Sequence, residues 1–252
     1  MIFRELEQLA DRIFIFPRDT TPDVIQPNIG VIRLEQQTVL IDAGNSLRHA
    51  RQIRAAMAGL NFQPIDTILY THHHWDHTFA GVSYNATTIV GHDYCDDYLV
   101  EYARRTWNTT TLRDAIYANP RLEVSYNAMM DAITDWSGFR IKRPSMTFSQ
   151  HLQLHLEDML IELEYVGGRH AKDSVIIKLP QYGIMFLGDA YYPPPFSERE
   201  DGDENLDLTM LNHWLDERYD IYIDGHGAPR NYKEFEMMIE QETTRQNKIN
   251  HR

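Results

Sequence analysis

Alternating apolar and polar positions in the first part of the chain indicate short strands with one helix between them. The expected strands are 13–16, 28–34, 38–42, 65–70 and 88–90. A polar turn at 35–37 joins the second and third of these as a hairpin. Ser46 can cap a helix from Leu47 to about Ala58, and Gly59 is suited to end it. This order of strands and helix is typical of a layered α/β protein.

The segment 93–143 differs from the rest because it is polar, rich in aromatic residues and helical in tendency. Candidate helices are 96–107, 112–118 and 124–136, with breaks at 109–111, Pro120 and Gly138. A connection this long inside a compact domain is usually functional. We therefore expect 93–143 to be a helical insertion that covers a site as a lid and sets substrate choice.

Eight aromatic side chains of the insertion could line a substrate pocket. They are Tyr94, Tyr98, Tyr102, Trp107, Tyr117, Tyr126, Trp136 and Phe139. For each of them taken singly, packing of the insertion onto the body, or a contact in a homodimer, is the favoured interpretation.

The strand pattern returns after Pro144. Expected strands are 151–156, 159–166, 174–179, 184–187 and 219–223, with helices at 206–217 and from Asn231 onward. His151 and His155 share the polar face of one strand, so we interpret them as solvated residues and not as ligands. No repeat, low-complexity tract or linker is seen, so residues 1–252 are expected to form a single domain.

The charge of the chain narrows the classes of partner. Its 24 Lys and Arg residues stand against 37 Asp and Glu, a formal net charge of −13, which argues against nucleic acid and anionic membranes as partners. A signal-peptide core and a membrane-spanning apolar run are both missing from the sequence, so we expect a cytoplasmic protein with a small-molecule substrate. The one cysteine, Cys95, cannot form an intramolecular disulfide, and its acidic neighbours make it a poor nucleophile.

The metal-capable side chains gather directly after the expected strand 65–70, in the pattern H-x-H-x-D-H. Residues two apart in an extended segment point to the same side, so His72 and His74 can bind one ion. Asp76 and His77 lie beyond the strand and can turn toward a second ion. Imidazole and carboxylate together suit zinc, and also iron or manganese. A histidine run can be an expression tag, but tags lie at termini and this run follows a core strand.

The segment 71–77 resembles the metal-binding motif of the metallo-β-lactamase superfamily, and the rest of that family's pattern follows in order. A histidine after a strand and glycines is His170, in G-G-R-H. An acidic residue that closes the next strand is Asp189, in F-L-G-D, and a late histidine is His226, in I-D-G-H-G. Upstream, V-L-I-D-A-G resembles the family's early strand, which ends in an Asp, here Asp42.

The resemblance implies an α/β fold, a four-layer αββα sandwich of two mixed β-sheets flanked by helices. It also implies two divalent metal ions, most simply Zn²⁺. One ion would be held by His72, His74 and His170, the other by Asp76, His77 and His226, with Asp189 as the bridge. The implied reaction is hydrolysis of an ester, lactone, thioester or amide-type carbonyl by a water that the ions activate. Asp76 would orient that water and relay its proton, and Asp42 and Asp66 are candidate acceptors for imidazole N–H groups.

Branches of the superfamily differ at positions that can be compared. His74 stands where flavodiiron proteins carry Glu, which favours hydrolysis over oxygen reduction. The short tail after His226 disfavours glyoxalase II-like thioesterases, which carry a helical C-terminal domain. Asp189 and Tyr192 stand where the best-known zinc β-lactamases carry Cys and Lys, which argues against β-lactamase activity. Lactonase-like enzymes share the ligand set. A mononuclear iron sulfur dioxygenase that does not use His77 or His226 stays open, as do a phosphodiesterase and an inactive binding module.

Overall fold

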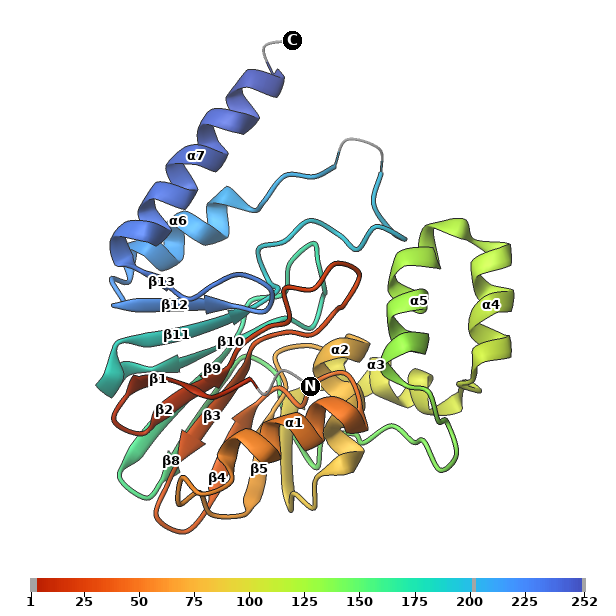
Figure 1. Cartoon of the computed structure of the whole chain (residues 1–252). Coiled ribbons are helices and arrows are strands. Elements are labelled where there is room, and N and C mark those ends of the chain that lie inside the picture. The colour runs from red at the N-terminus through yellow and green to blue at the C-terminus, as the bar shows by residue number, and fades with distance from the viewer. Residues whose placement is uncertain (1–3, 201–202, 251–252) are drawn as a thin grey trace.

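Two β-sheets packed face to face form the centre of the protein (Figure 1). The structure is a computed structural model that describes residues 4–200 and 203–250. The first sheet has the order β1-β2-β3-β4-β5-β6-β7: Glu7–Ala10, Ile13–Phe16, Ile29–Arg33, Thr38–Ile41, Ile65–Leu69, Thr88–His92 and Met146–Phe148. The second has the order β13-β12-β11-β10-β9-β8: Arg230–Asn231, Ile221–Asp224, Ile184–Gly188, Val175–Leu179, Met159–Tyr165 and His151–Leu156.

Both sheets are mixed, as expected. Strands β4 to β7 run parallel to one another, and so do β11 and β12, while the remaining neighbours pair antiparallel. The carboxyl ends of parallel neighbours lie at the same edge of a sheet. Segments that follow β4, β5, β11 and β12 can therefore meet at one edge of the sandwich.

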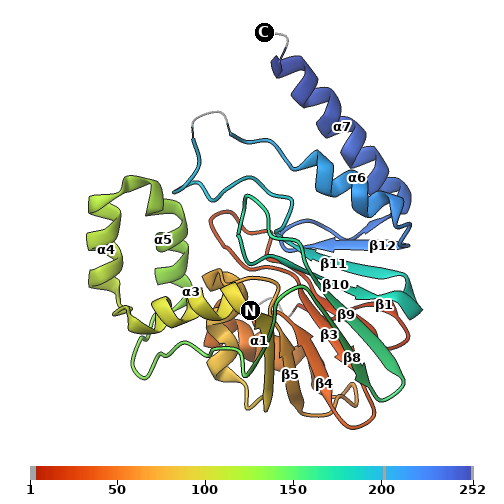
Figure 2. The same ribbon diagram turned by 180° about the vertical axis from the view of Figure 1, so that it is seen from behind.

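Helices cover the outer face of each sheet, which gives four layers (Figures 1 and 2). Helices α1 (Leu47–Met57) and α3 (Asp93–Arg104) bury Ile53 and Leu99 against the first sheet, while α6 (Leu208–Asp216) and α7 (Tyr232–Asn250) bury Trp214 and Phe235 against the second. The inner faces of the two sheets share one apolar core, to which β3, β4, β10 and β11 all contribute. The αββα sandwich expected from the sequence is confirmed.

The segment expected to be an insertion forms a helical projection beside the sandwich (Figure 1). It consists of α3, α4 (Thr109–Ala118), the short 3₁₀ turn η2 (Pro120–Leu122) and α5 (Glu123–Ala132). Strand β7 pairs in parallel with β6 after it, so the projection is inserted between two neighbouring strands. Its own apolar cluster joins Leu112 and Met129 to Trp75, which lies within the histidine motif, and to Phe79, which follows it.

The helix boundaries in this segment correct three expectations. The threonines at 109–111 do not break the chain but form the first turn of α4, because Asn108 caps it: Asn108 Oδ1 accepts from the Thr111 N–H at 2.9 Å. Helix α3 begins at Asp93 because the His92 side chain accepts from the Tyr94 N–H at 3.0 Å. Helix α5 ends at Ala132, before the expected end at 136.

Other elements lie close to their expected positions. Ser46 caps α1, as predicted, by accepting from the His49 N–H at 3.2 Å. Strand β1 was not expected. Helix α6 begins about two residues later than predicted because Asp207 caps it, and β12 also begins about two residues later than predicted. His151 and His155 are exposed on β8, as predicted. Among the described residues, no helix is both long enough and apolar enough to pass through a bilayer.

Candidate metal centre

The histidine motif lies in the turn between β5 and α2 (Trp75–Thr78), a single helical turn. Strand β5 delivers His72, and the chain then curves so that Asp76 and His77 lie on α2. Thr78 fixes this curve because its hydroxyl donates to the backbone oxygens of His73 (3.1 Å) and His74 (3.0 Å). A buried strand thus ends directly in a compact loop of four metal-capable side chains, as the sequence predicted.

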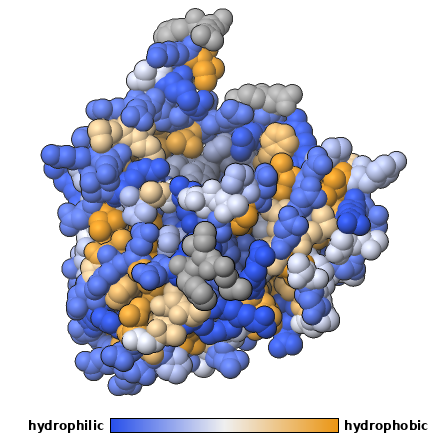
Figure 3. Space-filling view, viewed as in Figure 1, coloured by the Kyte–Doolittle hydropathy of each residue, from blue (hydrophilic) through white to orange (hydrophobic). Residues whose placement is uncertain are grey.

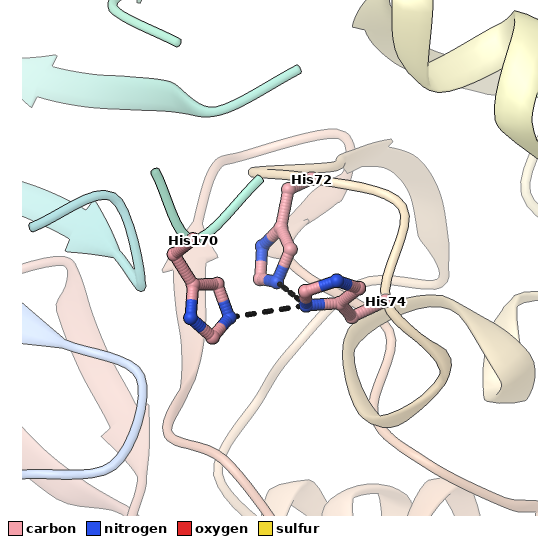
Figure 4. Close-up of side chains that lie close together, drawn as sticks. All are labelled: His72, His74 and His170. Atoms are coloured by element: carbon pink, nitrogen blue, oxygen red, sulfur yellow. Dashed lines mark hydrogen bonds between the residues drawn. The ribbon is translucent and has the colours of Figure 1, made fainter. Parts of the chain in front are cut away.

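Three imidazoles face one another at the first group of candidate ligands (Figure 4). His74 Nδ1 lies 3.0 Å from His72 Nε2 and 3.1 Å from His170 Nε2. Burial, and then the neighbouring histidines, lower the pKa of the His72 and His74 imidazoles well below the usual value. Neutral imidazole is the form that binds a metal. Three ring nitrogens this close to one point match the tetrahedral preference of zinc, with a position left over.

The second group combines Asp76, His77 and His226. Asp76 Oδ2 lies 3.4 Å from His77 Nε2 and 3.2 Å from His226 Nε2. Although His226 is more than 140 residues away in sequence, it reaches this point because it follows β12, which runs parallel to β11. The six predicted ligands that would each bind only one ion therefore converge at the same edge of the sandwich.

Asp189 lies between the two groups. Its Oδ2 is 3.3 Å from His170 Nε2 of the first group, and 3.3 Å and 3.5 Å from the Nε2 atoms of His226 and His77 in the second. The carboxylate follows Gly188 at the end of β11. This is the position that a carboxylate shared by two ions would take.

The hydrogen bonds around the cluster leave ring nitrogens directed inward. His77 Nδ1–H donates to Asp42 Oδ2 at 2.7 Å, and His170 Nδ1–H donates to the Pro193 oxygen at 3.0 Å. In each ring the other nitrogen, Nε2, then points toward the cluster, where the neutral form of the ring offers a lone pair to a metal ion. The expectation that Asp42 supports a ligand is confirmed. The same expectation for Asp66 is wrong, because its carboxylate accepts from the Thr87 hydroxyl (2.6 Å) near the opposite end of β5.

Two buried atoms and the charge of the cluster test whether cations fit. His77 Nε2 and Asp189 Oδ1 are buried without a hydrogen-bond partner among the residues that the structure describes. Burial alone would lower the pKa of His77, but Asp76, Asp189 and Asp42 outweigh it and raise that pKa well above the usual value. Burial alone would also lower the pKa of His226, but Asp189 and Asp76 outweigh it and raise that pKa to about 10. The carboxylates therefore require positive charge at this place, which protons or metal ions can supply. The donor set fits metal ions.

Glycines let the second sheet approach the cluster. A Cβ at Gly225 would lie 2.1 Å from Asp189 Oδ1 and 3.0 Å from His77 Cε1. At Gly188 the backbone has φ +51°, and a Cβ would lie 2.8 Å from the Cβ of Thr71. Side chains at these two positions would push the ligand-bearing segments apart.

Two carboxylates near the cluster were not assigned a role from the sequence. Asp173 is fully buried and accepts from His73 Nδ1–H at 2.8 Å. Its place three residues after His170 in the sequence did not indicate a contact with His73. Burial, and then Asp173, raise the pKa of the nearby Cys95 thiol well above its usual value, so Cys95 is not a nucleophile, as predicted.

The second unassigned carboxylate, Asp224, ends β12. It accepts from the hydroxyls of Tyr191 and Tyr192, both at 2.6 Å, and from Arg230 at 2.5 Å. It also accepts from the backbone N–H of His226 at 3.1 Å. These bonds hold the loop after Asp189 against the loop that carries His226. The D-G-H sequence around it is the signal that could have identified this residue.

A recess of about 650 Å³ opens from the cluster toward the insertion. His74, Asp76, His170, Asp189 and His226 lie at its base. Four of the eight aromatic residues proposed as pocket candidates line its wall: Tyr98, Tyr102, Trp107 and Tyr126. The other four do not, since Trp136 and Phe139 pack within the insertion's apolar cluster, Tyr94 borders another depression and Tyr117 is exposed. The insertion therefore forms one side of this recess.

Asp42→Ala should lower kcat/KM about 10- to 100-fold, the usual cost of removing a residue that orients a metal ligand. The substitution removes the acceptor of His77 Nδ1–H and of the Thr71 N–H (2.8 Å). The His77 ring is then no longer held in one tautomer, and the start of the motif is no longer held in place. Steady-state kinetics and metal content measure the effect. Asp66→Ala is the matched control, and equal losses in the two variants would contradict the role given to Asp42.

Comparison with known proteins agrees with this geometry. The family model described as "Metallo-beta-lactamase superfamily" matches residues 22–229. The curated 2,4-dinitroanisole O-demethylase subunit alpha of Nocardioides sp. (strain JS1661) is 24% identical over 206 residues, covering 80% of this chain and 53% of the relative. The chain thus spans about half the length of that relative.

Solved structures share the fold at low sequence identity. A metallo-beta-lactamase from Pontibacter korlensis has 15% identity and a TM-score of 0.63, with 94% of this chain and 97% of that chain covered. The stereoselective inverting sec-alkylsulfatase Pisa1 from Pseudomonas sp. has 13% identity and a TM-score of 0.67, with 95% and 41% covered. The match to the family model covers most of the chain and agrees with the fold and with the cluster of candidate metal ligands. It belongs to the metallo-beta-lactamase superfamily.

Proposed function

We propose that the protein is a dinuclear metal-dependent hydrolase that cleaves an ester, lactone, thioester or amide-type bond in a small molecule. The observation that carries this proposal is the position of Asp189, whose Oδ2 lies within 3.5 Å of histidine nitrogens from both ligand groups. One carboxylate between two sets of ligands is the arrangement expected of a site for two ions. Zinc is the proposed metal, given the imidazole and carboxylate donors.

The ligand roles follow from the two groups. His72, His74 and His170 would hold one ion, Asp76, His77 and His226 the other, and Asp189 would contact both. Two bound divalent ions supply Lewis-acid chemistry, which lowers the pKa of water to about 7 and stabilises negative charge on the substrate.

The chain's own residues position the reactants. Asp76 lies at the base of the recess and is largely buried, and its carboxylate can accept a hydrogen bond from the attacking water and orient it. Asp42 keeps His77 in one tautomer, and Pro193 does the same for His170. The insertion lines one side of the recess and would select the substrate.

The position of His77 and His226 bears on the alternative of a mononuclear iron sulfur dioxygenase. That alternative leaves both histidines without a metal. Here both rings face Asp76 and Asp189 at 3.2 to 3.5 Å, an arrangement that favours a second ion. The dinuclear hydrolase is therefore the better supported of the two.

The test combines metal analysis with a substrate panel. The purified protein should contain about two zinc ions per chain and should hydrolyse at least one member of a panel of lactones, esters, thioesters, β-lactams and phosphodiesters. An aryl methyl ether belongs in the panel because the curated relative is named an O-demethylase subunit. One iron per chain, with oxygen consumption on a persulfide, would support the dioxygenase instead and contradict the proposal.

A further inference from the structure

The outer part of the recess is walled by aromatic rings that other contacts hold in place. Tyr98 stacks on His73, with ring centroids 4.1 Å apart and an interplanar angle of 20°. Trp107 packs edge-on to Tyr102 at 5.4 Å, and its Nε1–H donates to the Tyr102 backbone oxygen at 2.8 Å. Because His73 lies between two ligands in sequence, this wall begins directly at the metal cluster. These contacts hold the aromatic rings of the wall in place before any ligand enters.

Three hydroxyl groups on this wall are available to a ligand. Tyr98, Tyr102 and Tyr126 line the recess, and none of their hydroxyls bonds to another described residue. The hydroxyls of Tyr70, Tyr84, Tyr191, Tyr192 and Tyr222, in contrast, all donate to protein acceptors. None of the three is among the buried atoms that lack a partner, so these hydroxyls remain open to solvent and to a ligand in the recess. Three such donors on one aromatic wall can serve a ligand that accepts hydrogen bonds.

Arg105 adds a cation beside these hydroxyls. Its guanidinium carbon lies 5.0 Å from the centroid of the Tyr102 ring. Burial raises the pKa of the Tyr102 and Tyr126 hydroxyls and Arg105 opposes that rise at both, so the guanidinium is near enough to act on each. Two arginines (Arg105, Arg121) and two glutamates (Glu101, Glu198) line this part of the recess. Their charges balance, which favours a neutral acceptor over a second anion.

The mouth of the recess is apolar. Val124 and Phe196 line it and are 61% and 57% exposed. Figure 3 shows hydrophobic atoms gathered over the α5 side of a face that is otherwise mostly hydrophilic. The volume of about 650 Å³ lies within the ordinary range for sites that bind small molecules. An apolar, flat group therefore fits between this mouth and the cluster.

We propose that the recess selects a substrate with a planar aromatic ring that bears a neutral hydrogen-bond acceptor, such as a nitro or carbonyl group. The ring would lie against Trp107 and the tyrosines, with the bond to be cleaved directed at the metal cluster. The acceptor would take hydrogen bonds from the hydroxyls of Tyr98, Tyr102 or Tyr126. An alkyl chain would fill the apolar space but would leave these donors and Arg105 unpaired. This inference rests on the proposed hydrolase function for the orientation of the substrate.

Three neutral alcohols of similar size test the inference by binding to the purified, metal-loaded protein in calorimetric titrations. We expect 4-nitrobenzyl alcohol to bind more tightly than benzyl alcohol, and benzyl alcohol more tightly than cyclohexylmethanol. Tyr98→Phe, Tyr102→Phe and Tyr126→Phe keep the rings, so at least one of them should weaken binding of the nitro compound about 2- to 10-fold and leave benzyl alcohol unchanged. Trp107→Leu should weaken both aromatic ligands. Tyr117→Phe, at a side chain 92% exposed on α4, is the matched control.

The acetate esters of the same alcohols separate this inference from the proposed function. Rates are divided by each ester's rate with hydroxide in water, which corrects for the leaving group. Hydrolysis without a preference for the nitrobenzyl ester, or equal binding of all three alcohols, would contradict the aromatic selection and leave the hydrolase function intact. Binding that follows the expected order without hydrolysis of any ester or other panel member would contradict the hydrolase function alone. No binding by any of the three alcohols would also contradict the inference.

Discussion

Replacing His72 or Asp76 by alanine is expected to lower kcat/KM by more than about 100-fold. Even a residue that only supports a ligand typically contributes about 10- to 100-fold, and these two side chains lie inside the cluster itself. His72 Nε2 is one of three imidazole nitrogens around a common point. Asp76 both contacts His77 and His226 and borders the recess where substrate and water would meet.

Neither variant should unfold the protein. The apolar cores between the sheets and under the flanking helices include none of the seven ligand residues, so thermal unfolding midpoints should change far less than activity. His151→Ala and Asp66→Ala are matched controls, since both positions lie outside the cluster and neither is buried. Activity within tenfold of wild type in either ligand variant, with metal content unchanged, would show that the mechanism is wrong.

The ligands of the first half of the chain could be predicted because local rules determine them. A β-branched strand that stops at a run of histidines fixes where His72 and His74 are and which way they point. No local rule, however, brings His170, Asp189 and His226 to the same edge. Those three follow strands of the second sheet, and only the packing of the two sheets joins them to the motif. The family resemblance supplied this information, and local periodicity alone could not.

Asp42 and Asp66 show why a position near a strand is not enough to predict that an acidic residue supports a metal ligand. Both flank strands of the first sheet, and these strands, β4 and β5, are parallel neighbours. Asp42 follows the end of β4, so it lies beside Thr71 and His77 at the carboxyl edge. Asp66 lies near the start of β5 and therefore at the opposite edge. The direction of the strand, and not proximity in sequence, decides which acidic residue reaches the cluster.

The helices of the insertion were predicted less well because side-chain capping competed with propensity. Three consecutive β-branched threonines predict a break, yet Asn108 and Thr111 exchange hydrogen bonds with each other's backbone and start α4 there. Strand β1 has only partly buried or exposed positions, so its hydrophobic pattern is weak. Some aromatic side chains of the insertion line the recess, and others pack inside the insertion or are exposed. A helix presents more than one face, and the sequence alone does not show which face is turned toward the recess.

Asp189→Asn is expected to lower the metal content from about two ions per chain toward one, as measured by mass spectrometry after dialysis. Its carboxylate oxygen Oδ2 approaches histidines of both ligand groups. A neutral amide is a weaker ligand, and the two groups should respond differently. His72, His74 and His170 still present three imidazole nitrogens, whereas the group around Asp76 keeps two imidazoles, whose high pKa lets protons compete with a metal ion, and a single carboxylate. The second ion should therefore be lost first, and activity with it. Asp66→Asn should retain both ions. Full metal content in Asp189→Asn would remove this residue from the ligand set and, with it, the shared carboxylate on which the dinuclear proposal depends.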